Sequence, residues 1–232
     1  MVWKKALKTR GGAGPSGLDA NGWRVILSTN KFGPVASDLC TAIATLARKL
    51  ASSCCHHLQA LTACRLIPLE KKPGCRPIGV GEVLRRIIGK CIMEVVKDDV
   101  RAAAGNLQVC AGHQAGGEAA IHAMRLIFEQ RDCEAVLLVD ASNAFNILNR
   151  KAALHNIKIK CPSFAMYVEN SYRNPSDLYI VNNKALRGDT ILQSTEGTTQ
   201  GDPVAMAMYA IGLSVLQQEI KYETTRVKQV AY

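Results

Sequence analysis

The sequence predicts an α+β fold, because helix-like and strand-like patterns both occur along its 232 residues. Apolar residues recur at three- and four-residue spacing over 37–61, 81–104 and 117–130, which is typical of amphipathic helices. Short apolar runs bounded by turn residues indicate two hairpins, over 65–80 and 177–194. A composition of 48% hydrophobic and 21% charged residues is that of a globular domain and excludes collagen, coiled coil and general disorder.

Net charge and cysteine usage point to an intracellular protein with a polyanionic partner. The net charge is +10 and the isoelectric point is about 9.3. The nine cysteines are odd in number and several lie in apolar runs, which favours a reducing compartment. The cluster Cys54-Cys55-His56-His57 lacks the spacing of zinc ligands. The chain shows no secretory signal, and its longest apolar run, 204–213, is about half of a membrane span. We therefore expect a location in the cytoplasm or nucleus and no membrane partner.

The first half of the chain predicts helices around one hairpin. A loop rich in Gly, Pro and Ser at 11–17 leads into a short capped helix at 18–23. The hairpin at 65–80 turns at Pro73-Gly74, a type II turn signal, and its prolines suggest edge strands.

The helix at 81–104 carries an apolar stripe and several cations, four of which are considered as one surface. The stripe includes Ile87, Ile88 and Ile92. We expect the cations to lie away from much of this stripe and to form a positive surface; they are Arg85, Arg86, Lys90 and Lys97.

The second half predicts a buried strand, a hairpin and a buried helix. The run 135–140 is continuously apolar and ends in Asp140, as in a strand buried on both faces. Asp202 suits the N-cap, and Pro203 the first position, of a helix that ends near residue 220. The last residues, 227–232, predict another strand.

Two segments carry residues that local structure explains only in part. A carboxylate at the end of a buried strand needs a partner or a metal, although Asp140 could simply cap a helix and Phe145 could be a core aromatic. A loop and helix cap accounts for much of 197–203, but not for Gln200 or for the small residues Gly197 and Gly201, which would let another molecule approach the backbone.

Four stretches, in order, resemble the fingers and palm of a reverse transcriptase of the retrotransposon type. They are Gly14–Asp19, Leu66–Leu69 through Arg76–Ile78, Val139–Asp140 through Phe145, and Thr199–Pro203. The resemblance covers nearly the whole chain. It implies a right-hand polymerase with a fingers region at 1–133 that contains a fingertip hairpin at about 65–80. Residues 134–232 would form part of a palm, an antiparallel sheet backed by helices.

The resemblance assigns the catalytic metals to the end of the predicted strand. Asp140 matches the carboxylate that binds both catalytic Mg²⁺ ions, and the backbone carbonyl of Ala141 would bind the second ion. Phe145 matches the aromatic residue that closes against the 2′ position of the incoming nucleotide, and thereby favours deoxynucleotides.

The resemblance also assigns contacts to the nucleotide itself. Gln200 and Gly201 match the motif that packs against the incoming nucleotide and the template base. Arg76, and less directly Lys71 or Lys72, match the fingertip cations over the triphosphate.

The function implied is template-directed DNA synthesis from dNTPs on an RNA template and a DNA primer, with two Mg²⁺ ions. Only one of the usual three carboxylates is present, because the sequence given stops at Tyr232, where the paired-aspartate motif would begin. We expect these 232 residues to bind Mg²⁺ weakly and to lack polymerase activity alone. Two alternatives stay open. The first is a non-catalytic nucleic-acid-binding remnant of a retroelement, which the codons beyond 232 would distinguish from an enzyme. The second is a metabolic enzyme, which lacks support because no P-loop or dinucleotide glycine pattern occurs.

Overall fold

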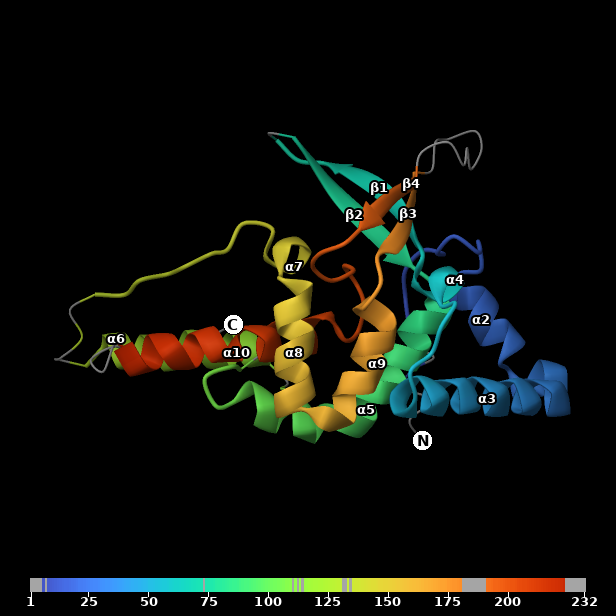
Figure 1. The fold of residues 1–232 in the computed structure, drawn as a ribbon, viewed down its shortest axis with the longest axis horizontal. Coiled ribbons are helices and arrows are strands. Elements are labelled where there is room, and N and C mark those ends of the chain that lie inside the picture. Colours follow the sequence, from blue (N-terminus) through green and yellow to red (C-terminus); the bar gives the residue numbers. More distant parts are fainter. Residues whose placement is uncertain are drawn as a thin grey trace.

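A computed structural model of the chain describes residues 6, 8–72, 74–109, 111, 113, 115–130, 133, 135–180 and 191–223 (Figure 1). The four strands are β1 (Cys64–Glu70), β2 (Cys75–Gly81), β3 (Ser176–Ile180) and β4 (Ile191–Ser194). The helices are α2 (Ala20–Ile26), α3 (Thr29–Ser52), α4 (Gln59–Thr62), α5 (Val83–Ala104), α6 (Gly116–Phe128), α7 (Ala144–Ile147), α8 (Arg150–Lys160), α9 (Pro162–Tyr172) and α10 (Ala205–Glu223). The α+β class predicted from the sequence is therefore confirmed.

The four strands form one sheet in the order β2-β1-β3-β4. The β1–β2 and β3–β4 pairs are antiparallel, which confirms both predicted hairpins. The sheet is mixed rather than antiparallel throughout, because β1 and β3 pair in parallel over three residues from Cys64 opposite Leu178. One sheet thus contains strands from both predicted regions, the fingers at 1–133 and the palm at 134–232. Pro77 lies on the edge strand β2, as expected. The same expectation is wrong for Pro68, which lies on the interior strand β1, beyond the three residues of β1 that pair with β3.

The hydrophobic core lies among the helices that support the sheet. Helix α5 packs against α3, α9 and α10, and α8 packs against α9 and α10 (Figure 1). The fully buried side chains at these contacts include Ile88, Val100, Ile157, Phe164, Val168, Met208 and Ile211. The predicted helices at 81–104 and 117–130 are confirmed as α5 and α6. No helix in the described ranges has both the length and the apolar character needed to cross a bilayer.

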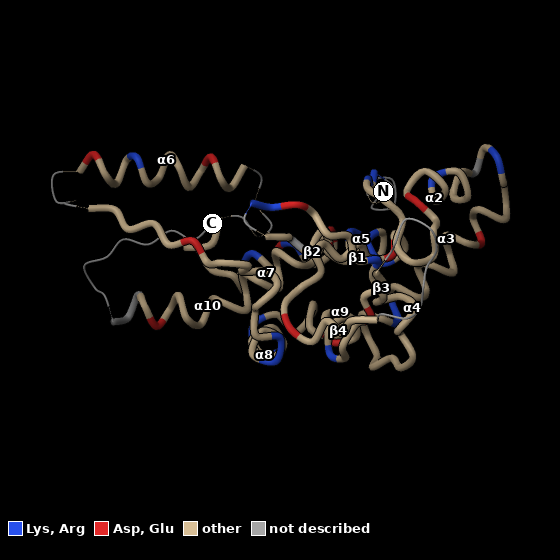
Figure 2. Tube along the Cα trace, turned by 90° about the horizontal axis from the view of Figure 1, so that it is seen from above, with Lys and Arg blue, Asp and Glu red and all other residues tan. Residues whose placement is uncertain are grey.

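The prediction of a buried strand at 135–140 is wrong for this structure. The segment belongs to no strand, and Leu137, Leu138 and Val139 are 84–85% exposed. Figure 1 shows it as an extended trace on one side of both α6 and α10, and Figure 2 also shows it away from the sheet. A continuous apolar run becomes a buried strand only where neighbouring strands and covering helices are supplied, and β1–β4 pair among themselves.

Helix boundaries near the N-terminus differ from the prediction for local reasons. The helix expected at 37–61 begins earlier, at Thr29. It is interrupted at Gly33, which has a φ of 50° and is followed by Pro34. It ends at Ser52, and α4 follows as a separate turn of helix. The short capped helix is confirmed, since the Asp19 side chain accepts a hydrogen bond from the Gly22 amide.

Three expectations fall wholly or partly outside the described residues: Pro73 of the predicted type II turn, the turn at Asn182-Asn183 and the strand at 227–232. The helix expected to open at Pro203 begins at Ala205 instead. One carboxylate oxygen of its predicted N-cap, Asp202, accepts a hydrogen bond from the Val204 amide at 3.1 Å. The other oxygen binds Arg85 of α5 and Tyr172 of α9.

Candidate functional site

The segment that carries Asn146 and the loop that carries Gln200 touch through their backbones. The Thr198 amide donates to the Phe145 carbonyl at 2.7 Å, and the Gly197 amide donates to the Leu148 carbonyl at 2.9 Å. A Cβ at Gly197 would lie 2.3 Å from the Asn146 carbonyl oxygen, so only glycine fits there. The close approach expected at Gly197 is therefore made by the chain itself, whereas the space around Gly201 is open.

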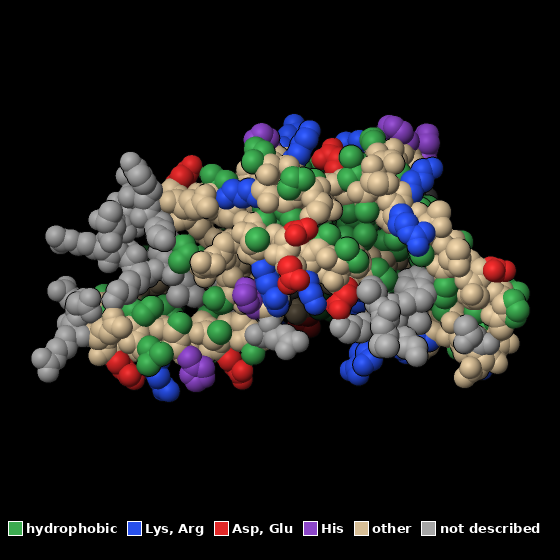
Figure 3. Space-filling view, turned by 90° about the horizontal axis from the view of Figure 1, so that it is seen from below, with side chains coloured by type: hydrophobic (Ala, Val, Ile, Leu, Met, Phe, Trp, Pro, Cys, Tyr) green, Lys and Arg blue, Asp and Glu red, His purple; other side chains and the backbone are tan. Residues whose placement is uncertain are grey.

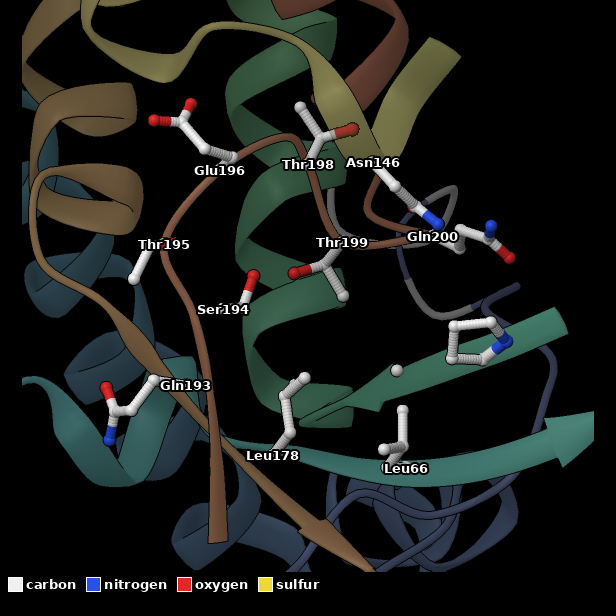
Figure 4. Close-up of a pocket in the computed structure, with 12 residues that line it drawn as sticks. Leu66, Asn146, Leu178, Gln193, Ser194, Thr195, Glu196, Thr198, Thr199 and Gln200 are labelled. Carbon is white, nitrogen blue, oxygen red and sulfur yellow. The ribbon is translucent and has the colours of Figure 1, made fainter. Parts of the chain in front are cut away.

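A pocket of about 300 Å³ lies where the base of the β1–β2 hairpin meets this loop (Figure 4). Its walls are apolar at β1, β2 and β3 and polar at β4 and the loop that follows it. It is lined by Leu66, Pro77, Gly79, Asn146, Leu178, Gln193, Ser194, Thr195, Glu196, Thr198, Thr199 and Gln200.

Two side-chain amides face this pocket with hydrogen-bonding capacity to spare. Asn146 and Gln200, both half-buried, make no side-chain hydrogen bond to another described residue, and Figure 4 shows them near each other at the pocket wall. No Lys or Arg is among the twelve lining residues, and Glu196 is the charged one. The pocket therefore suits a neutral, planar, hydrogen-bonding group better than an anion.

Asp140 and Phe145 are not among the residues that line this pocket. The Phe145 ring packs on Tyr209 of α10, with ring centroids 4.9 Å apart. Partial burial, with the nearby negative charge of Asp140, raises the pKa of Tyr209. Asp140 itself is exposed, and neither Asp140 nor Phe145 lines the pocket that holds Gln200.

The structure gives the predicted metal site little support. Among the described residues, no group of three or more His, Cys, Asp or Glu side chains could hold a metal ion. Asp140 and the exposed Ala141 that follows it offer one carboxylate and one carbonyl, fewer oxygen ligands than Mg²⁺ requires. We therefore derive no chemical step through a metal.

The predicted fingertip cations lie at the far end of the β1–β2 hairpin. Lys71 and Lys72 are exposed, and the Lys71 amide donates to the Gly74 carbonyl at 3.1 Å. Arg76 lies on β2 opposite Leu69, and its side chain is outside what the structure describes. Figure 3 shows that, on the face seen from below, basic side chains alternate with acidic and apolar ones rather than forming one continuous patch.

The positive surface predicted on α5 is wrong in two of its four members. Arg85 is buried, and the half-buried Arg86 donates to the carbonyls of Arg10 and Gly12 in the N-terminal loop. The same loop is fixed at Ser16, whose amide and hydroxyl both donate to the Glu82 carboxylate at 2.7 Å. These arginines satisfy groups within the protein instead of facing solvent.

Arg85 forms a buried ion pair with Asp202 that the sequence analysis missed. The Arg85 Nη2 and Asp202 Oδ2 atoms are 2.8 Å apart, and both side chains are 3% exposed. Burial lowers the pKa of Arg85 and the Asp202 charge raises it, with a net upward shift. One signal was available: Arg85 precedes Ile88 and Ile92 by three and seven residues, so helical spacing places it on the buried face.

Tyr172 connects this ion pair to the Gln200 loop. Its hydroxyl donates to Asp202 Oδ2 at 2.7 Å and accepts from the Thr199 amide at 3.3 Å. The Arg85 and Arg150 guanidinium carbons lie 4.7 and 5.5 Å from the Tyr172 ring centroid. Burial, reinforced by the Asp202 charge, raises the pKa of Tyr172 well above its ordinary value.

Arg150 binds the segment 194–197, which leads into the same loop. Its guanidinium donates to the carbonyls of Ser194, Glu196 and Gly197 at 2.8–3.1 Å, and to the Ser194 hydroxyl. Its backbone amide donates to the Glu196 carboxylate at 2.8 Å. Burial lowers the pKa of Arg150, although five donors in fixed geometry keep it a cation suited to this role.

The site thus consists of a loop held by several hydrogen bonds, a pocket beside it whose charged lining residue is Glu196, and the exposed carboxylate of Asp140, which does not line the pocket. Known protein families provide no match to this chain, and no curated protein matches its sequence.

Proposed function

We propose that the chain is the fingers and part of the palm of an RNA-directed DNA polymerase, and that it binds an RNA template, a DNA primer and a dNTP. One observation carries this proposal: the backbone contact between Phe145 and Thr198. It brings the residue that the resemblance assigns to the nucleotide sugar close to the loop that it assigns to the nucleotide and template base. These segments are about fifty residues apart in sequence, and the resemblance requires them to lie close together because it assigns both to one nucleotide.

The pocket adds support from its chemistry. Side-chain amides such as those of Asn146 and Gln200 can pair with the edge of a base, and the apolar wall at Leu66 and Leu178 can receive its face. A triphosphate would be repelled by Glu196 and would lie outside the pocket. Lys71 and Lys72 are its proposed partners, and they lie on the hairpin whose base lines the pocket.

The metal part of the proposal depends on Asp140. This carboxylate would bind both Mg²⁺ ions, with the Ala141 carbonyl on one of them. The proposal for this chain is tested through nucleotide contacts, because one carboxylate supports only weak Mg²⁺ binding.

Photo-crosslinking tests the proposal directly. The chain would be incubated with an RNA–DNA template–primer and 8-azido-dATP, irradiated, and mapped by mass spectrometry. We expect adducts within 145–146, 198–201 or 77–79. Gln200→Ala should reduce labelling about fivefold, the equivalent of roughly 1 kcal/mol for a lost hydrogen bond.

The matched control is Gln218→Ala on α10, whose side chain accepts from Lys160 and does not line the pocket. Labelling that is equal in Gln200→Ala and Gln218→Ala, or that maps elsewhere, would contradict the proposal.

A non-catalytic nucleic-acid-binding protein is the second candidate, favoured by the net charge of +10. It predicts salt-dependent binding of the template–primer with no specific labelling by the dNTP analogue. Fluorescence anisotropy at several salt concentrations, run beside the crosslinking, separates the two functions.

A further inference from the structure

We propose that Tyr172 is a positioning residue, which with Arg85 and Arg150 fixes the turn that presents Gln200 to the pocket. Its link to a nucleotide rests on the function proposed above, whereas its effect on the turn does not. The three side chains come from three helices, α9, α5 and α8. None of them is among the residues to which the sequence resemblance gave a role.

Residues Thr199 to Asp202 form a turn whose two ends meet at one buried hydroxyl. The Asp202 amide donates to the Thr199 carbonyl at 3.1 Å, and Gly201 has a φ of 79°, as the third residue of a type II turn requires. The Tyr172 hydroxyl accepts from the Thr199 amide and donates to the Asp202 carboxylate. Gln200 and Gly201, which lie between these ends, are therefore held at a fixed place and direction.

The hydroxyl is itself held in place. The Tyr172 ring contacts two guanidinium groups, and Arg85 also pairs with the carboxylate that the hydroxyl binds. Arg150 binds the backbone at 194–197, directly before the turn. Movement of the turn would break several of these contacts together, so its conformation is set before any ligand arrives.

Tyr172 acts through Gln200 rather than on a ligand. It is 1% exposed and does not line the pocket. Removing its hydroxyl should loosen the turn while the core of α9 stays packed. A residue that served only the hydrophobic core would not show this local effect.

Amide hydrogen exchange of the ligand-free chain tests the proposal with Tyr172→Phe. The control is Tyr167→Phe: it removes one hydroxyl from an equally buried tyrosine on the same helix, whose hydroxyl hydrogen bond goes to the Arg85 carbonyl at 3.5 Å. We expect exchange at Thr199 and its neighbours to be about fivefold faster in Tyr172→Phe and unchanged there in Tyr167→Phe. Equal exchange of the turn in both variants would overturn the proposal.

A second variant covers the case in which Tyr172→Phe does not fold. Arg150→Lys keeps the charge but loses the fork that binds several carbonyls. Faster exchange at Gly197 and Thr198, with α9 still protected, would support the proposal, and unchanged exchange would overturn it.

Crosslinking of 8-azido-dATP to the same variants separates the two proposals. Labelling that falls about fivefold in Tyr172→Phe but not in Tyr167→Phe supports the link from Tyr172 through Gln200 to a nucleotide. If the turn exchanges faster in Tyr172→Phe but 8-azido-dATP labels not even the wild-type chain, the positioning role is retained and the proposed function is rejected.

Discussion

The ion pair between Arg85 and Asp202 should be one of the strongest single couplings in the protein. We would replace Arg85 by Met and Asp202 by Asn, singly and together, and measure the free energy of unfolding. Arg85→Met leaves a buried carboxylate whose remaining donors among the described residues are the Tyr172 hydroxyl and the Val204 backbone amide. The expected cost is about 3–5 kcal/mol, as for other buried pairs that lose one partner.

The coupling energy follows from the geometry. Opposite charges at the observed 2.8 Å attract by about 6 kcal/mol at an effective dielectric constant of about 20. The hydrogen bonds that Asp202 keeps in Arg85→Met offset part of this. We therefore expect a coupling of about 2–4 kcal/mol, with the double variant about 1 kcal/mol less stable than either single one.

Urea unfolding followed by circular dichroism measures all four proteins under one set of conditions. The exposed pair Arg101 and Asp98, at 3.3 Å on the same helix, is the control, and its cycle should give less than about 0.5 kcal/mol. An Arg85–Asp202 coupling no larger than that of the control would refute the reasoning. It would mean that the pair does not hold the 199–202 turn.

Two further predictions concern the same region. Because burial raises the pKa of Tyr172, the native form keeps this proton more tightly than the unfolded chain does. Tyr172 therefore contributes a fall in stability of about 1.4 kcal/mol per pH unit above about pH 10, in addition to the fall from Tyr167, whose pKa burial also raises. Urea midpoints between pH 9 and 11 should show a shallower fall in Tyr172→Phe, and an identical fall would contradict this. Gly197→Ala should lower the free energy of unfolding by more than about 3 kcal/mol, because its Cβ would lie 2.3 Å from backbone atoms and its φ is 67°. Gly201→Ala, at a φ of 79° in open space, should lower it by about 1 kcal/mol. Equal losses in urea unfolding would show that the contact with Asn146 is not close.

Local patterns predicted the elements whose stability is local. The hairpin at 65–80 needed only two apolar runs and a turn signal, and helix 81–104 needed only its repeat. The strand at 135–140 failed because its assignment depended on neighbours, and an apolar run of six residues carries no information about which strands will pair with it. The parallel pairing of β1 with β3 was missed for the same reason.

The candidate site was predictable at the level of motifs and not of contacts. Gln200 was singled out because loop chemistry left it unexplained, and it does line a pocket. Arg85 and Asp202 were assigned local roles, on a helix face and at a helix cap, because a partner more than a hundred residues away leaves no mark on local periodicity. Asn146 gave no signal at all, since its place beside Gln200 depends on how Gly197 meets α7.

The parallel junction between β1 and β3 has a consequence for synthesis on the ribosome. The β1–β2 hairpin can close soon after it emerges, but the strand that completes its inner edge, aligned from Cys64 to Leu178, follows roughly 110 residues later. At about 5–20 residues per second, this leaves the edge of β1 without its partner for about 6–20 s. Nascent copies on one messenger would carry this open edge at the same time, and slower translation between codons 81 and 176 would lengthen the interval in which they can pair wrongly with one another.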